Sequence, residues 1–383
     1  MITHLQKWSL LALLAAGSLS AQEWKPSDWP VLKHYDKEHL FQIALPLGGI
    51  GTGTVSLGGR GELRDWEIMN VPGKKYSTVT TGNNAPFFSI YVKSQDNIPV
   101  TTLLEGPLYS HEYLHYEGRP VNHHGFPRFA EASFDGAYPF GQVNLSDAEL
   151  PVTVKIKGFN PLLPGNADDS GLPVAVLAYE VTNTGDSPLE VSVCGSMRNF
   201  IGKDGSKFRT DWKGDYIPVG AEKNRNEYRE SGNRKGIYLY SEGVDKQDPA
   251  WGTIALVTSS TGQVSYRTSS KADSWNNAIL NFWDDFSEDG VMVEREQPSD
   301  EDPMASLAVK KTIAPQATET FVFYLTWNFP NRKGWSSTIV GNYYSRQFAD
   351  AWEVAEKVIP RMKQLEEETL LFLSLIHISE PTR

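Results

Sequence analysis

The sequence from Gln22 to about Asn342 is a succession of strand-length segments separated by turn signals rich in Gly, Pro, Asn and Asp. Residues 189–194, for example, alternate apolar and polar side chains, which is the period of a strand with one buried face. We find no internal repeat and no low-complexity linker in this range. Repeated short strands with turns between them are typical of a β-sandwich or a β-barrel.

Three pairs of neighbouring segments are predicted to form antiparallel strand pairs. In the first pair, Leu63, Asp65 and Glu67 are expected to share one face, opposite Arg64, Trp66 and Ile68. In the third, Phe321 to Trp327 carries apolar side chains on both faces, as in a strand that is packed on both sides. The pairs are residues 54–57 with 62–68, the two arms of 174–193 around a turn at 183–188, and 306–313 with 320–327.

The composition excludes several classes of protein. The 383 residues carry a formal charge of −11, which argues against nucleic acid as a partner because phosphates require a basic face. No apolar run reaches the roughly 18 residues of a membrane span. The single cysteine, Cys194, rules out an intrachain disulfide and a cysteine-cluster metal site, and its position suits a small strand residue. The 11 Trp and 16 Tyr are frequent in proteins that handle sugars, although many such residues simply form cores.

Residues 1–21 have the order of an export signal. Lys7 is followed by an apolar stretch from Trp8 to Ala16 and then by small residues. The apolar stretch is too short to cross a bilayer, so cleavage near Ala21–Gln22 is the better interpretation. We therefore expect a secreted or periplasmic protein.

The other end of the chain is predicted to be helical. From Tyr344 to Thr369 apolar residues recur every three or four positions, and Pro360 should kink or split the helix. We place a linker helix at residues 343–372. Residues 373–383 have no helix stop signal and resemble the spurious ends of fragmentary sequences, so we interpret them as a non-native tail.

Three motifs suggest ligands, and each has a plainer interpretation. Gly48 to Gly53 resembles a dinucleotide-binding loop. The next segment is strand-like and not a helix, however, which favours a tight loop without a cofactor. His111 to His115 matches H-E-x-x-H, yet Pro107 and Pro120 leave barely two helical turns, so a zinc site is the remote alternative. Residues 166–171 offer oxygen ligands for calcium but lack the Glu of an EF-hand, which favours an Asx turn.

Two carboxylate pairs could serve glycoside hydrolysis, which requires two carboxyls about 5 to 9.5 Å apart. Asp65 and Glu67 are two positions apart on an expected strand. Asp284 and Asp285 lie among aromatic residues that could raise a pKa. Surface carboxylates are common in an acidic protein, so neither pair is diagnostic.

The glycine loop also carries a resemblance. Residues 45–53 followed by 61–70 resemble the N-terminal domain of glycoside hydrolase family 116, the family of the non-lysosomal glucosylceramidase, or bile-acid β-glucosidase. The resemblance covers most of residues 36–372. Further motifs keep the family order: residues 137–140, 150–152, 159–164, 169–174, 181–183, 251–252, 282–287 and 327–330.

The resemblance implies a mostly β fold: a large two-sheet antiparallel β-sandwich, or supersandwich, at residues 22–342, with a C-terminal linker helix. It implies that an (α/α)6 catalytic barrel follows and supplies both catalytic carboxylates, so this chain is a fragment with no catalytic residue, cofactor or metal of its own. The partners would be that missing barrel and, through it, a β-glycoside. The residues expected at the substrate rim or the interdomain surface are Trp66, Asn70, Trp283 and Trp327.

The parent activity implied is that of a retaining β-glucosidase or glucosylceramidase. Two other functions stay open: a stand-alone carbohydrate-binding sandwich, and, more remotely, a zinc peptidase built on the residues 111–115.

Overall fold

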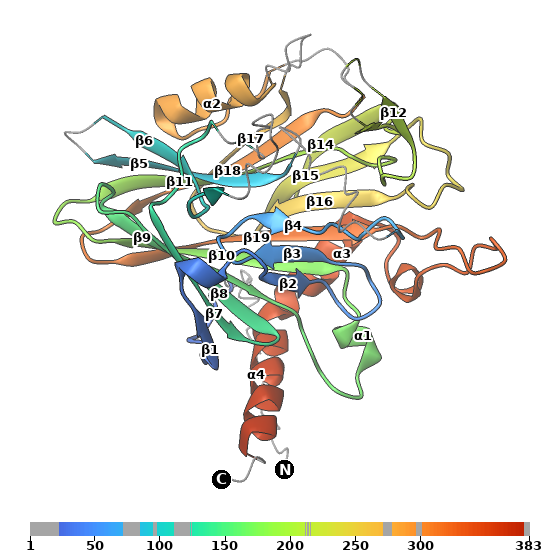
Figure 1. Cartoon of the computed structure of the whole chain (residues 1–383), viewed down its shortest axis with the longest axis horizontal. Coiled ribbons are helices and arrows are strands. Elements are labelled where there is room, and N and C mark those ends of the chain that lie inside the picture. Colours follow the sequence, from blue (N-terminus) through green and yellow to red (C-terminus); the bar gives the residue numbers. More distant parts are fainter. Residues whose placement is uncertain are drawn as a thin grey trace, which may run out of the picture.

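The computed structural model describes residues 23–71, 85–94, 98–110, 123, 125–210, 212, 214, 216–270, 278–295 and 301–378. Among them, the largest element is a nine-stranded antiparallel sheet in the order β1-β7-β8-β9-β10-β19-β16-β15-β14 (Figure 1). Its strands are β1 (Lys33–Tyr35), β7 (Glu131–Ala137), β8 (Phe140–Ser146), β9 (Val152–Phe159), β10 (Val174–Asn183), β14 (Asn224–Ser231), β15 (Arg234–Ser241), β16 (Thr253–Thr258) and β19 (Thr318–Asn328).

A five-stranded sheet packs against it to form the core. The rings of Phe88 and Tyr179 lie 4.9 Å apart between centroids, and those of Phe88 and Phe323 lie 5.2 Å apart, so aromatic residues of both sheets meet between them. The expected two-sheet β-sandwich is confirmed. The second sheet has the order β17-β18-β11-β5-β6, with β5 (Phe87–Ser94), β6 (Val100–Leu103), β11 (Leu189–Arg198), β17 (Gln263–Ser270) and β18 (Met304–Ile313).

The second and third predicted strand pairs are wrong, although their strands are right. β10 pairs with β9 and β19, whereas β11 pairs with β18 and β5, so each predicted pair is divided between the two sheets. Alternation predicts a strand and a turn but not whether the turn stays within one sheet. The Asn183 side chain stabilises the crossing. Its Nδ2 donates to the carbonyls of Ser187 and Ile313, 2.8 and 3.1 Å away, which ties the two sheet-crossing turns together.

The first predicted pair is confirmed in part. A small sheet contains β2 (Ala44–Leu47), β3 (Val55–Gly58) and β4 (Leu63–Arg64), with β3 antiparallel to both neighbours. β4 ends at Arg64 because Asp65 has a φ of 50°, which a strand does not accommodate. Leu63 and Trp66 are therefore both buried, and the predicted two-face alternation over residues 62–68 is wrong. A further ribbon pairs β12 (Phe208–Thr210) with β13 (Tyr216–Pro218).

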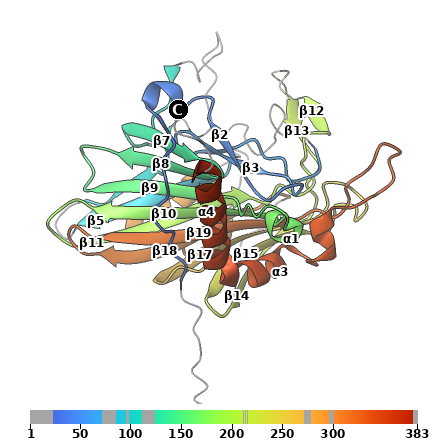
Figure 2. The same cartoon turned by 90° about the horizontal axis from the view of Figure 1, so that it is seen from below.

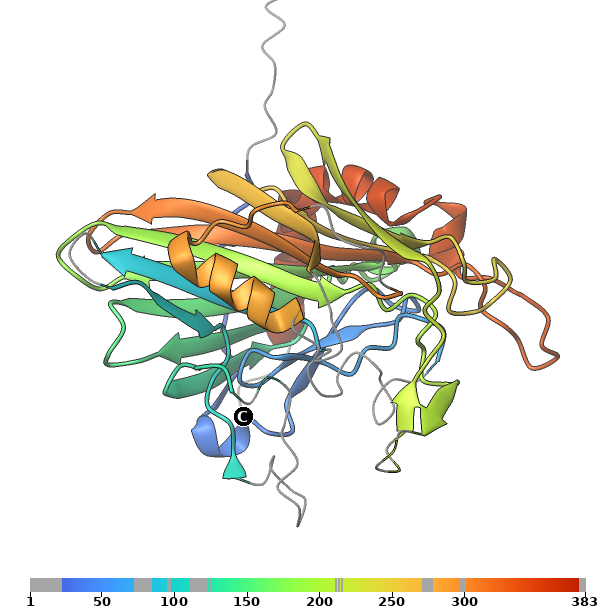
Figure 3. The ribbon, with the colours of Figure 1, turned by 90° about the horizontal axis from the view of Figure 1, so that it is seen from above.

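Helices cover the outer faces of the sandwich. Helix α2 (Ala278–Asp289) lies across the five-stranded sheet, as Figure 3 shows, and its Phe282 ring is 5.2 Å from Phe87 of β5. The sequence pattern predicts only strands before residue 342, and this is wrong for α2, whose Ile279, Phe282 and Phe286 have helical spacing. Cys194 is buried beneath this helix in an apolar cluster, as a small strand residue should be.

The C-terminal helix is split where Pro360 predicted it. α3 (Ala351–Val358) is followed by a 3₁₀ turn (Ile359–Arg361) and by α4 (Met362–Ile378). α3 packs on the outer face of the nine-stranded sheet, where Thr326 Oγ1 donates to the Ala351 carbonyl at 2.7 Å. α4 extends from the body on the side away from α2 (Figures 1 and 2). A search of the described residues finds no helix with the length and apolar character of a membrane span.

Candidate functional site

The glycine loop between β2 and β3 is a point of close backbone packing. Gly48 has a φ of 120°, and a Cβ there would lie 2.6 Å from the Gly53 carbonyl oxygen. The indole of Trp327 donates to the Thr52 carbonyl at 2.8 Å from beneath the loop. Strand β3 follows instead of a helix, so this loop lacks the helix N-terminus that a dinucleotide pyrophosphate requires. The tight-loop interpretation describes it correctly.

Asn70 joins three segments next to this loop. It has a φ of 66°, a conformation that Asn tolerates better than most residues. Its Nδ2 donates to the carbonyls of Pro249 and Phe329 at 3.0 and 3.3 Å, and its Oδ1 accepts from Asn342 Nδ2 at 2.8 Å. The pair Asn70–Asn342 therefore holds residues 65–71 against the connection between β19 and α3. We call residues 48–53, 65–71 and 329–344 together the glycine-loop face.

Two cavities flank the loop on this face. The first, of about 340 Å³, lies between Ile50, Leu163, Asn166 and Tyr343. The second, of about 280 Å³, is lined by Glu67, Asn70, Arg332 and Asn342, among others. The first is lined by apolar residues and a few uncharged polar ones, whereas the second presents a carboxylate, a guanidinium and two amides. Such a mixture suits contact with a polar surface or with hydroxyl groups.

The two predicted tryptophans on this face lie beneath it. Trp66 and Trp327 are buried in the main core. Trp66 packs edge-on against Phe200, with ring centroids 5.4 Å apart. Neither ring offers a free face to a sugar in this structure, so both support the glycine-loop face from inside. Of the predicted rim residues, Asn70 lines the second of these two cavities, whereas Trp66, Trp283 and Trp327 line neither.

The residues considered for calcium form a capped turn. α1 (Ala167–Ser170) begins after Asn166, whose Oδ1 accepts from the Asp169 backbone N–H at 3.1 Å. Arg361 lies 2.8 Å from Asp169, and its hydrogen bond holds the pKa of that carboxyl below the ordinary value. Asp168 accepts from Tyr343 Oη at 2.8 Å. The carboxylates are thus engaged by the 3₁₀ and α-helical segments that follow β19.

No cluster of three or more His, Cys, Asp or Glu side chains suited to a metal occurs in the part of the chain that the structure describes. The H-E-x-x-H sequence at 111–115 lies outside the described residues. His123, just beyond it, is buried, with Nε2 2.8 Å from the Ala85 carbonyl oxygen. Burial lowers its pKa.

Neither predicted carboxylate pair has both side chains on one face of a strand or helix. Asp65 and Glu67 do not share a strand face, because β4 ends before them. Asp284 and Asp285 are consecutive on α2, so they point in different directions. Asp284 is exposed, whereas Asp285 is buried.

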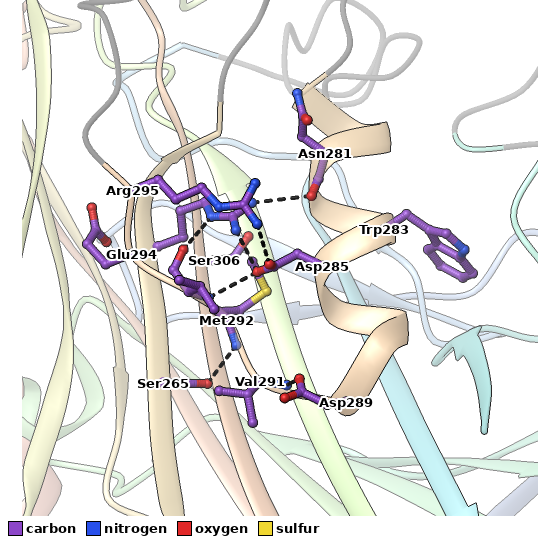
Figure 4. Close-up of polar contacts among 12 residues, drawn as sticks. Ser265, Asn281, Trp283, Asp285, Asp289, Val291, Met292, Glu294, Arg295 and Ser306 are labelled. Atoms are coloured by element: carbon purple, nitrogen blue, oxygen red, sulfur yellow. Dashed lines mark hydrogen bonds and ion pairs between the residues drawn. The ribbon is translucent and has the colours of Figure 1, made fainter. Parts of the chain in front are cut away.

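Asp285 is the centre of an ionic cluster, drawn in Figure 4. Its Oδ2 lies 2.5 Å from Arg267 Nη2, and its Oδ1 lies 2.8 Å from Arg295 Nη2. Its Oδ2 also accepts from the Val293 backbone N–H at 3.0 Å. Beside it on α2, Trp283 stacks on Phe126 with centroids 4.4 Å apart, so one face of its ring is covered. The cluster fastens α2 to β17 and has no free carboxylate for catalysis.

A second buried ionic cluster escaped the sequence analysis. Glu105 lies 2.9 Å from Arg60 and 3.1 Å from Arg128. Burial acts to raise the pKa of Glu105, but the two guanidiniums together hold it below the ordinary value. These residues are 45 and 23 positions from Glu105 in the chain, so no local pattern connects them.

Solved structures match the chain only at low similarity. Structures with similar shape include a protein described as a kojibiose phosphorylase from the human microbiome, at 9% identity and a TM-score of 0.36, and a polysaccharide lyase, at 10% and 0.33. They cover 89% and 80% of this chain, which spans about a third of their length (31% and 34%). A protein described as an aldose 1-epimerase from Klebsiella pneumoniae matches at 10% identity and a TM-score of 0.28. The match covers 82% of this chain and 81% of that protein. These scores are too low to carry an argument.

The family comparison is decisive. Residues 44–365 match the profile described as beta-glucosidase 2, glycosyl-hydrolase family 116 N-term. The matched range begins at β2, includes the glycine loop and every strand of both sheets except β1, and ends within α4. The chain therefore belongs to glycosyl-hydrolase family 116, as the N-terminal domain of that family.

Proposed function

We propose that this chain is the non-catalytic N-terminal domain of a β-glycosidase whose catalytic carboxylates lie in a following helical barrel. The observation that carries the proposal is the match of residues 44–365 to the N-terminal domain of the family. Two of the carboxylates first considered for catalysis support it, because Asp285 and Asp65 are held in ion pairs with Arg267 and Arg64. The parent enzyme would be a retaining β-glucosidase or glucosylceramidase.

An activity assay tests whether catalysis requires the following barrel. The purified chain should not hydrolyse an aryl β-glucoside, whereas a protein encoded by the complete reading frame should do so. Turnover by the chain alone, at a rate that persists through further purification, would overturn the proposal. An inactive complete protein would argue against the parent activity and leave the family assignment intact.

The glycine-loop face is the surface that we propose for contact with the barrel and its substrate. Ile50 and Val340 are 71% and 67% exposed on it, and Tyr343 is 56% exposed. Apolar side chains on loop tips beside two cavities suit an interface better than open solvent. Asn70 would shape the rim, Trp66 and Trp327 would support it from below, and Trp283 would lie apart from it on α2.

Export is a further part of the proposal. Cleavage near Ala21–Gln22 would release a mature domain into the periplasm or the medium. Intact-mass measurement of the protein from each cell fraction checks this. A cytoplasmic product that retains residues 1–21 would contradict it.

A further inference from the structure

Glu366 of α4 is a buried carboxylate bound by neutral donors. Its side chain accepts four hydrogen bonds, all from the segment at residues 23–29. Trp24 Nε1 donates at 2.8 Å and Trp29 Nε1 at 2.6 Å, and Ser27 donates through its backbone N–H and its hydroxyl at 2.8 and 2.9 Å. Glu366 is 2% exposed, so water cannot easily replace these donors.

The segment at 23–29, which we call the strap, crosses the outer face of the nine-stranded sheet. At its start, Glu23 lies 3.2 Å from Lys311 and accepts from Thr261 Oγ1 at 2.7 Å. In its middle, the Ser27 carbonyl accepts from Lys157 Nζ of β9 at 3.0 Å. After the strap, β1 joins the sheet edge by pairing with β7.

Aromatic packing seats the strap on the sheet. The ring of Trp29 lies 4.8 Å from Phe140 and 5.6 Å from Phe159, and the ring of Trp24 lies 5.8 Å from Phe159. Both tryptophans thus turn one part of the indole to the sheet and the N–H to α4. The strap lies between the two and contacts both.

Helix α4 has few other polar anchors to the body. Thr369 Oγ1 accepts from the Leu162 backbone N–H at 3.1 Å, and Arg361 at the preceding turn pairs with Asp169. Met362 and Leu365 are buried, whereas Glu367, the residue after Glu366, is largely exposed. Glu366 is therefore the polar contact that joins α4 to the strap.

We propose that the strap holds α4 in its orientation through its hydrogen bonds to Glu366. If the strap lifts, the Glu366 carboxylate loses all four donors at once. A buried carboxylate without donors is strongly unfavourable, so α4 must move until water reaches it. The strap and α4 consequently open and close as one unit. The strap thereby determines the direction in which α4 leaves the sandwich. This inference rests on contacts within the chain and not on the proposed function.

Hydrogen exchange followed by mass spectrometry tests the contact between the strap and Glu366 on the full chain. Glu366→Gln removes the charge and places an N–H₂ group against the indole donors. Peptides covering residues 23–29 and 362–372 should both exchange about tenfold faster, the change expected for loss of a buried hydrogen bond in a locally opening unit. Peptides of β10 and β11 should be unchanged. Glu367→Gln, the exposed neighbour, is the matched control and should match the unmodified chain.

A second variant tests the coupling from the strap side. Trp24→Phe with Ser27→Ala removes two of the four donors, the indole N–H of Trp24 and the hydroxyl of Ser27, and retains an aromatic ring at position 24. It should accelerate exchange in residues 362–372, although α4 itself is unchanged, and it carries the test if Glu366→Gln does not fold. Faster exchange confined to the strap, or a uniform increase across both sheets, would overturn the proposal.

Discussion

The guanidinium of Arg267 on β17 lies 2.5 Å from the carboxylate of Asp285 on α2, and both side chains are almost completely buried. Asp285→Asn should therefore destabilise the chain by about 3–5 kcal/mol, because it leaves a buried guanidinium without its counter-charge. Urea unfolding measures the loss. Asp284→Asn, one position away but exposed, is the control and should change the free energy of unfolding by less than about 0.5 kcal/mol. Equal effects at both positions would contradict the structural role assigned to the ion pair.

The amide of Asn342 holds the glycine-loop face together. It donates to Asn70 Oδ1 at 2.8 Å and to the Phe329 carbonyl at 2.7 Å. Asn342→Ala should lower the free energy of unfolding by about 1–3 kcal/mol, since buried acceptors lose their donor. Ser336→Ala, an exposed position in the same connection, serves as control. If thermal melting cannot distinguish the two variants, Asn342 does not hold this face.

Two glycines of the same loop should respond differently to a methyl group. Gly53 and Gly51 have φ values of 83° and 76°, so alanine costs backbone strain at both. A Cβ at Gly53 would also collide with the Glu67 carbonyl oxygen, whereas a Cβ at Gly51 would meet open space. Gly53→Ala should therefore destabilise the chain clearly more than Gly51→Ala, in denaturant melts made side by side. The reverse order would show that the loop relaxes more easily than its packing indicates.

His123 should make the chain less stable in acid. Burial holds its pKa below the ordinary value of 6.5, so the unfolded chain takes up a proton first. The contribution of His123 to the free energy of unfolding is therefore fully present above about pH 6.5. It declines as the pH falls from that value toward the pKa of His123 in the folded chain. His123→Gln keeps an N–H donor for the Ala85 carbonyl but cannot titrate. Urea midpoints at pH 7.5 and 5.5 should fall less in the variant than in the unmodified chain. Identical falls would mean that other groups account for the acid sensitivity.

Much of the fold could be predicted locally. The strand positions, the turn at residues 183–188 and the split at Pro360 follow from side-chain period and from backbone restrictions that act within a few residues. Helix α2 could also have been found, since its apolar residues have helical spacing. The sheet that β10 and β11 each join could not be predicted, because it involves distant contacts such as that of Asn183 with the Ile313 carbonyl, 130 residues away.

The candidate site could likewise be predicted only in part from local sequence. The residues 45–53 and 61–70 identified the family, and Asn70 does line a cavity of the glycine-loop face. Trp66 and Trp327 were expected at the rim, but their rings are buried. An aromatic residue in a strand has the same local pattern whether its ring faces a core or a ligand. Its exposure depends on what packs over the strand.

The sequence by itself therefore determined the strands, the family and the separation of a β domain from a helical C-terminal segment. Only the tertiary structure decided which sheet each strand joins and which of two adjacent carboxylates is buried. Asp285 and Glu366 are acidic residues beside other acidic residues, with nothing local to single them out. They are distinguished by partners far away in the chain: Arg267 for the first, and Trp24 and Trp29, more than 330 positions distant, for the second. Such contacts exist only once the sheets have brought those segments together.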